Sequence, residues 1–235
     1  MQALTLDHVG LYLPAATPLD LSLLNDLVSL GINHLFAEQG VDLTGCAASK
    51  ITRCIGHDTE RPDRAPCAII SEVSPRGAVF AAQHGLPIVS SAATTPGGFN
   101  ALAANWELYE RYANRAGFDA RRGNWSLVVP MHLAETREAA RSEVAANLMR
   151  WLARHPGLAT LLPGFSDPIE ALISRAFAVI GTQEDAIAQV LRLTGATGGF
   201  GQFLLLYQDW ATPQETARSI ELCLDSLAAA PRWYP

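Results

Sequence analysis

The sequence lacks the features that mark membrane, secreted and nucleic-acid-binding proteins. No apolar run approaches membrane-spanning length, and no basic segment precedes an apolar one at the start of the chain. Basic residues are scattered in a chain of formal net charge -6, which argues against nucleic acid as a partner. Only four cysteines occur, at irregular spacing, as expected for a reduced protein. We therefore expect a cytoplasmic protein that binds neither membranes nor nucleic acid.

Motifs of several catalytic and metal-binding classes are also missing. Cys46, Cys54, His57 and Cys67 do not follow a zinc-ligand spacing, so we expect no metal site. There is no G-x-S-x-G elbow and no carboxylate pair in a glycosidase-like context. The glycine-rich stretch 195–201 lies between a predicted helix and a predicted strand, in that order. A dinucleotide-binding loop needs the reverse order.

What the sequence does contain is an alternation of strands and helices. Apolar stretches predict six strands, at about 6–13, 32–37, 67–71, 87–90, 125–133 and 201–208, with helical spacing between most of them. The segment of about 38–66 has no sustained period, and we interpret it as a long irregular loop. Such alternation is typical of a parallel sheet in an α/β fold. With 49% hydrophobic residues, the 235 residues suffice for one core, so residues 1–235 are predicted to form a single domain.

Several helices are predicted to begin with a capping residue followed by proline. The pairs are Thr17-Pro18, Ser74-Pro75, Thr95-Pro96, Asp167-Pro168 and Thr212-Pro213. Most of them follow a predicted strand directly, so in a parallel sheet these helix N-termini would gather on the face where (β/α) folds place their sites. Proline is also simply a stable way to begin a helix, and this explanation is adequate for each pair alone.

The turn from Ser74 to Gly77 is the strongest local candidate for a binding site. Ser74 can cap the helix, Arg76 adds a positive fork, and Gly77 keeps the approach to the backbone open. The free N–H groups and the positive dipole end of a helix bind anions, phosphate above all. The alternative, which residue chemistry alone favours, is an ordinary capped helix with a surface arginine.

Four stretches resemble the luciferase-like, flavin-dependent monooxygenase superfamily, in particular its limonene-monooxygenase-like branch. They are SPRGAVFAAQHG (74–85), NWSLVVPMHLAETREAA (124–140), FAVIGTQEDAIAQV (177–190) and GGFGQFLLLYQDWA (198–211). The resemblance implies a TIM-type (β/α) barrel that holds reduced FMN at its C-terminal face and activates O2. In that family the Ser-x-x-Gly turn cradles the FMN phosphate, which favours the phosphate interpretation of Ser74–Gly77.

The chain is short for that family. A full barrel takes about 250 residues, and the segment 38–66 cannot hold the two strand–helix units missing from the predicted six strands. The resemblance therefore implies an internal deletion and a reduced or incomplete barrel. Two open sheet edges would then need a cover, which makes a homodimer possible.

Five further residues are site candidates at the ends of predicted strands. Glu38 and Ser90 could contact the flavin, whereas a solvated carboxylate and a strand-end serine are the simpler alternatives. His132 could position substrate or handle a proton, although a lone histidine beside an apolar strand is more often structural. Asp209 and Trp210 could line the pocket, or could anchor the turn into the last helix.

The function predicted from the resemblance is that of an FMN-dependent monooxygenase. It would use FMNH2 from a separate flavin reductase, and O2, to oxidise a small apolar substrate. In such enzymes the flavin performs the chemistry, so no single residue is an obligatory catalyst. The alternatives are a non-catalytic flavin-binding protein and a truncated, inactive member whose barrel does not close.

Overall fold

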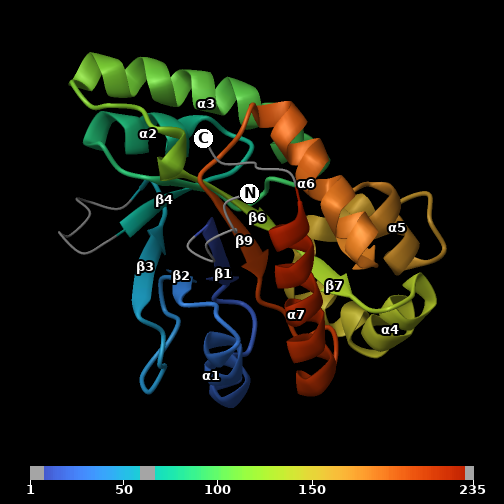
Figure 1. Ribbon diagram of the computed structural model, residues 1–235. Coiled ribbons are helices and arrows are strands. Elements are labelled where there is room, and N and C mark those ends of the chain that lie inside the picture. Colours follow the sequence, from blue (N-terminus) through green and yellow to red (C-terminus); the bar gives the residue numbers. More distant parts are fainter. Residues whose placement is uncertain (1–7, 59–66, 231–235) are drawn as a thin grey trace.

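The computed structural model describes residues 8–58 and 67–230 (Figure 1). The strands are β1 (Val9–Leu13), β2 (His34–Glu38), β3 (Lys50–Ile55), β4 (Cys67–Ser71), β5 (Ile88–Ser90), β6 (Trp125–Val129), β7 (Met131–Leu133), β8 (Val179–Gly181) and β9 (Gln202–Leu206). The α-helices are α1 (Leu21–Ser29), α2 (Arg76–His84), α3 (Pro96–Ala116), α4 (Arg137–Arg154), α5 (Pro168–Ser174), α6 (Gln183–Thr197) and α7 (Pro213–Ala229). No helix in these ranges is long and apolar enough to cross a membrane.

Seven parallel strands form a closed barrel in the order β1-β2-β3-β4-β5-β6-β9 (Figure 1). Closure comes from β9, which pairs with β1 on one side and with β6 on the other; Leu11 lies opposite both Leu35 and Leu205. The TIM-type α/β fold is thus confirmed. The barrel is also reduced, with seven strands instead of the usual eight. The expectation of two open sheet edges is wrong, and closure removes the reason for which a homodimer was considered.

The irregular segment predicted over 38–66 contains strand β3, which pairs with β2 and β4. The strand was missed because its inward-facing positions, Lys50, Thr52 and Cys54, are polar or small rather than aliphatic. Residues 59–66, the last part of the predicted loop, lie outside the described residues. The sheet therefore gains the strand that lets it close.

The predicted strand 125–133 is divided by Pro130, which has no N–H to donate to a sheet. Before Pro130, β6 pairs with β9; after it, β7 pairs with β8 in a separate two-stranded sheet. Strand β8 was not predicted, because its three residues stand directly before the predicted start of α6. Helices α4 and α5 pack on this second sheet beside the barrel (Figure 1).

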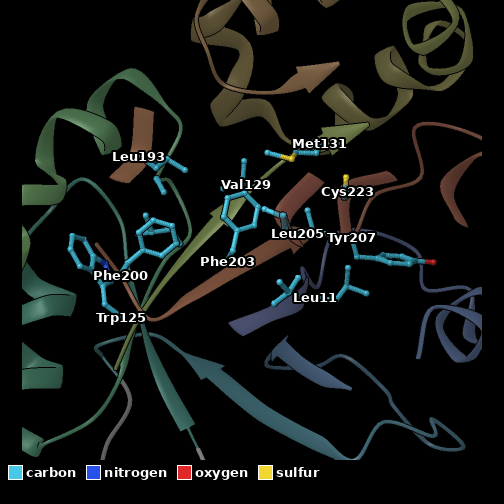
Figure 2. Packing of buried hydrophobic residues seen from close by; sticks show 14 of the residues in the cluster. Leu11, Trp125, Val129, Met131, Leu193, Phe200, Phe203, Leu205, Tyr207 and Cys223 are labelled. Atoms are coloured by element: carbon cyan, nitrogen blue, oxygen red, sulfur yellow. The ribbon is translucent and has the colours of Figure 1, made fainter. Parts of the chain in front are cut away.

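The main core lies between the barrel wall and the surrounding helices. Figure 2 shows outward-facing Phe203 and Leu205 of β9 with Leu11 of β1, close to Cys223 of α7. Trp125 stacks on Trp106 of α3, with ring centroids 4.9 Å apart. Truncation of such buried aromatic side chains typically costs about 3–5 kcal/mol, so this layer fixes α3 and α7 to the barrel. Smaller clusters fill the barrel interior and the space under α4 and α5.

The predicted helix caps are only partly correct. Thr95, Asp167 and Thr212 accept hydrogen bonds from Gly98, Ile169 and Glu215 N–H groups at the starts of α3, α5 and α7. Helix α1, however, is capped by Asp20 and not by Thr17. Helix α2 begins at Arg76 with Pro75 at the N-cap position, one residue after the predicted Ser74. The Ser74 hydroxyl nevertheless accepts from the Arg76 N–H, so only the N-cap position differs from the prediction.

Candidate functional site

A recess of about 260 Å3 opens where β3 and β4 end, at the C-terminal mouth of the barrel. We call it the C-terminal recess; it is lined by Gly56, His57, Asp58, Ile70, Glu72, Ser74 and Gly77. Two of the predicted phosphate ligands, Ser74 and Gly77, thus lie in one recess. The Ser74 hydroxyl accepts from the Arg76 N–H at 3.4 Å, a long contact, so the first turn of α2 has N–H groups available to an anion.

Gly77 is needed for packing as well as for access. A Cβ at this position would lie 2.4 Å from the carbonyl oxygen of Ile70 and 3.1 Å from Cα of Ser71. The first turn of α2 therefore lies directly against the end of β4, closer than any residue with a side chain permits. This contact fixes the position of the Ser74–Gly77 turn relative to the barrel.

Charges in and near the C-terminal recess have both signs. Arg76 is exposed and forms no ion pair with any described residue, so its guanidinium is available to an anion. Asp58 and Glu72, however, line the recess with carboxylates, which would repel a phosphate dianion. The helix start beside the recess therefore suits a phosphate, and Arg76 would attract it, but the carboxylates of Asp58 and Glu72 would repel it.

Glu38 lies at the same mouth, where its carboxylate ties β1 to β2. One oxygen accepts from the Tyr12 hydroxyl at 2.7 Å, and the other accepts from the N–H of Ala15 at 2.9 Å. Burial, and the neighbouring carboxylate of Glu38, raise the pKa of Tyr12, so the phenol stays protonated and donates. Glu38 is thus a positioned carboxylate at the barrel mouth, as its prediction requires, although it does not line the C-terminal recess.

Ser90 does not face the C-terminal recess. Its neighbour Val89 belongs to the interior cluster of the barrel, so the alternation along β5 turns Ser90 toward the helices. There its hydroxyl accepts from the Trp125 indole N–H at 3.0 Å. In this structure Ser90 therefore satisfies the buried indole N–H of Trp125 in the main core.

His132 belongs to the second sheet and points to the helices around it. Its Nε2 lies 2.7 Å from Glu143 of α4, whose other oxygen accepts from Arg218 of α7. Burial lowers the pKa of His132, and the hydrogen bond that His132 donates to the Glu143 carboxylate opposes that shift. The three side chains connect β7, α4 and α7, the structural role that was the alternative for this histidine.

Asp209 and Trp210 also have structural partners. The Asp209 carboxylate accepts two hydrogen bonds from Arg154 at the end of α4, at 2.5 and 2.7 Å. Trp210 is fully buried and meets Trp151 edge to face, with centroids 5.2 Å apart. In the barrel order, β9 lies three strands from β4, so this pair and the Ser74 turn stand at different parts of the rim.

The residues that prediction missed are those following β3. Gly56, His57 and Asp58 line the C-terminal recess, and they were assigned to a loop because β3 itself was not recognised. The β-branched residues Ile51, Thr52 and Ile55 were the available signal. All four cysteines are free, and the described residues hold no group of three or more His, Cys, Asp or Glu that could bind a metal ion.

Comparisons with known proteins give the chain its relatives. Over 167 residues, 68% of this chain, it is 37% identical to limonene 1,2-monooxygenase of Rhodococcus erythropolis. Over 172 residues, 69% of this chain, it is 32% identical to 4-hydroxyprotoasukamycin monooxygenase of Streptomyces nodosus subsp. asukaensis. The resemblance to the luciferase-like flavin monooxygenases is confirmed. The matched part covers 42% and 46% of these relatives, so the chain spans less than half of the family members it matches.

Solved structures agree with this family at the level of the fold. A monooxygenase from Streptomyces bottropensis superposes with a TM-score of 0.66 at 13% identity, covering 94% of this chain and 98% of that one. The oxygenating constituent of 3,6-diketocamphane monooxygenase from Pseudomonas putida, solved in complex with FMN, gives 0.55 at 20% identity over 72% and 50%. No family model matches the chain.

Proposed function

We propose that this chain is an FMN-dependent monooxygenase that receives FMNH2 from a separate flavin reductase and uses O2 to oxidise a small apolar substrate. The observation that carries the proposal is the 37% identity to limonene 1,2-monooxygenase over two thirds of the chain. A neighbour of the same fold was solved with FMN, and the Ser74–Gly77 turn lies at the barrel mouth where the family resemblance expects the phosphate.

The residues present fit one end of FMN. Ser74, Arg76 and the first-turn N–H groups of α2 would hold the phosphate. The C-terminal recess, at about 260 Å3, is just below the roughly 300 Å3 at which ligand pockets begin, so it suits the phosphate end and not the ring system. The ring would lie above the barrel mouth. When bound, FMN supplies the redox chemistry, and the chain supplies binding, orientation and dryness.

Side chains at the mouth are suited to an apolar substrate. Ile70 and Leu206, near the C-terminal ends of β4 and β9, pack against the interior cluster of the barrel. They make the inner surface of this mouth apolar. Tyr12 and Glu38 satisfy one another, so they add no unpaired polar atom beside that floor. A bound apolar molecule would displace water there without leaving a hydrogen-bonding group unsatisfied.

The second candidate is a flavin-binding protein without turnover. It is favoured by the structural partners of His132, Asp209 and Trp210, which leave none of the three predicted catalytic candidates in the C-terminal recess. The third alternative required a barrel that does not close, and the closed barrel contradicts it.

FMN binding tests the proposal first. We expect saturable binding in a titration followed by flavin fluorescence, with FMN competing far better than riboflavin because the phosphate carries much of the affinity. The double variant Ser74→Ala/Arg76→Ala should weaken FMN at least about tenfold, since two polar contacts are lost. Arg111→Ala, which removes an exposed arginine on α3, is the matched control.

Two outcomes would overturn parts of the proposal. Unchanged affinity in the double variant would show that the phosphate binds elsewhere, and no binding by the folded wild type would end the flavin assignment. If FMN binds, enzyme and binding protein are separated by supplying reductase, NADH and limonene and assaying for an oxygenated product. Binding without product would favour the non-catalytic protein.

A further inference from the structure

The opposite mouth of the barrel carries a second recess, of about 560 Å3. We call it the N-terminal recess; it lies where β2, β3, β4, β6 and β9 begin, so it opens on the face away from Ser74, which follows the end of β4. Its volume falls within the roughly 300–1,000 Å3 of pockets that bind small molecules. The N-terminal face of such barrels ordinarily serves stability, and this recess is therefore unexpected there.

The barrel interior at this end is polar. Buried His34, Thr52 and Ser126 and half-buried Gln202 occupy inward positions near the starts of four strands, where bulky branched aliphatic residues are the rule. His34 Nε2 lies 2.9 Å from the Thr52 hydroxyl, and its Nδ1 lies 3.3 Å from the Gln202 amide nitrogen. A layer of buried polar groups lowers stability wherever one of the groups lacks a hydrogen-bond partner. The partner can be another protein group or a bound molecule.

One hydroxyl in this layer is not used by the protein. Ser126 is buried in register with Gln202 and lines the N-terminal recess. None of the hydrogen bonds formed within residues 8–58 and 67–230 involves its hydroxyl. It can therefore donate to, or accept from, a molecule in the recess.

Among the described residues, one cationic side chain, that of Lys50, lies at the rim of the N-terminal recess. Lys50 is the only lysine in the sequence, and it lies two residues before inward-facing Thr52 on the same side of β3. It lines the recess and takes part in none of the ion pairs within the described ranges. None of the described lining residues is acidic, so residues 8–58 and 67–230 give the recess a positive charge without a counter-ion.

The remaining wall is apolar: Phe36 of β2, together with Leu86 and Pro87 ahead of β5, lines the same recess. We propose that the N-terminal recess binds a small organic carboxylate with an apolar, ring-sized body. The carboxylate pairs with the Lys50 ammonium, the body lies against Phe36 and Pro87, and a polar substituent reaches Ser126. This site is separate from the proposed flavin site, and it does not depend on it.

The single lysine makes the proposal directly measurable. Reductive methylation with ¹³C-formaldehyde labels Lys50 and the terminal amine only, and keeps the lysine charged. On titration with benzoate and 4-hydroxybenzoate, we expect the Lys50 resonance to move saturably while the terminal-amine resonance stays in place. The neutral isostere benzamide, and acetate, which lacks the apolar body, should each bind at least about tenfold more weakly.

Variants of the lining residues test whether the Lys50 charge binds the carboxylate, independently of any effect on folding. Lys50→Gln should weaken 4-hydroxybenzoate at least about tenfold by calorimetry, Lys50→Arg only a few-fold, and Ser126→Ala should weaken 4-hydroxybenzoate more than benzoate. Arg53→Gln removes the exposed cation of the outer face of the same strand and should have no effect. No saturable shift with either aromatic carboxylate would overturn the proposal, as would equal affinity in folded Lys50→Gln. Saturating FMN should leave the affinity unchanged.

Discussion

The two mouths of the barrel differ in the size of their recesses and in the charge of the residues that line them. The C-terminal recess is small, lies beside the start of α2 and has carboxylates on its wall. The N-terminal recess is about twice as large, and its described lining includes a lysine and no acidic residue. Local sequence signals point to the first, whereas volume and charge favour an anion in the second. The backbone motif and the side-chain charges of the same chain thus point to two different mouths of the barrel as binding sites.

A packed interior separates the two recesses. Tyr12, Phe36, Val128 and Leu204 belong to one buried cluster inside the barrel. Since close-packed side chains leave little space for water or ligand, each mouth can be changed by mutation without direct contact with the other. The comparison can therefore be tested one end at a time.

The largest effect is expected at the C-terminal mouth, from Gly77→Ala. The new Cβ would meet the Ile70 carbonyl at 2.4 Å, so α2 must move away from β4. We expect a loss of about 3 kcal/mol in the free energy of unfolding, measured by urea denaturation. Gly157→Ala, at a position with nothing within 4 Å of the added methyl, is the matched control. Equal stability of the two variants would contradict the close packing.

A smaller effect is expected at the N-terminal mouth, as a dependence on pH. Burial, with the charge of Lys50 second, lowers the pKa of His34 to about 4. The unfolded chain, with a histidine pKa of about 6.5, therefore binds a proton that the folded chain excludes. Stability is full above about pH 6.5 and falls as the pH drops toward about 4, by roughly 2 kcal/mol.

The variant His34→Gln isolates this contribution. It should lose less stability than the wild type between about pH 7 and pH 4.5 in urea denaturation, because the titrating group is gone. His84→Gln, at the exposed end of α2, should keep the wild-type pH dependence. An unchanged slope in His34→Gln would contradict a buried, neutral histidine at this mouth.

The smallest effect concerns the opposing charges of the C-terminal recess. Asp58→Asn with Glu72→Gln removes both carboxylates from its wall, so FMN should bind a few-fold more tightly, about 1 kcal/mol. Glu107→Gln with Glu221→Gln removes two exposed acids from α3 and α7 and gives the same change in net charge. If both pairs strengthen FMN equally, the effect is one of overall charge, and the recess is not the phosphate site.

The parts of the fold that could be predicted have local signals. Apolar strands and the Thr95 and Thr212 caps depend on neighbouring residues, and the structure has them as expected. Strand β3 could not be recognised, because Lys50 and Thr52 face the barrel interior where an aliphatic pattern is expected. The polar residues that made the strand hard to recognise, Lys50 and Thr52, are the same ones that line the N-terminal recess.

The candidate site was predictable only where the chain itself makes it. The Ser74–Gly77 turn is contiguous, so its position at a strand end followed from the sequence. The roles of the other candidates depend on distant partners: Asp209 on Arg154, Trp210 on Trp151, and His132 on Glu143, Arg218 and the fold that joins them. No spacing in the sequence indicates such pairings, which arise from how α4 packs on the second sheet beside the barrel.

The pairing of β1 with β9 has a consequence for synthesis of the chain. Residues 9–12 meet residues 203–206, so the first strand leaves the ribosome long before its partner exists. Until β9 arrives, β1 and β6 each present an unpaired edge that can recruit another chain. Pairing β9 with β1 closes a loop of nearly the whole chain. This step is slow, because the conformational entropy of that loop must be lost before the contact stabilises the pair. Nascent chains that stop before residue 202 should therefore associate, and release of the last strand should end that exposure in a single step.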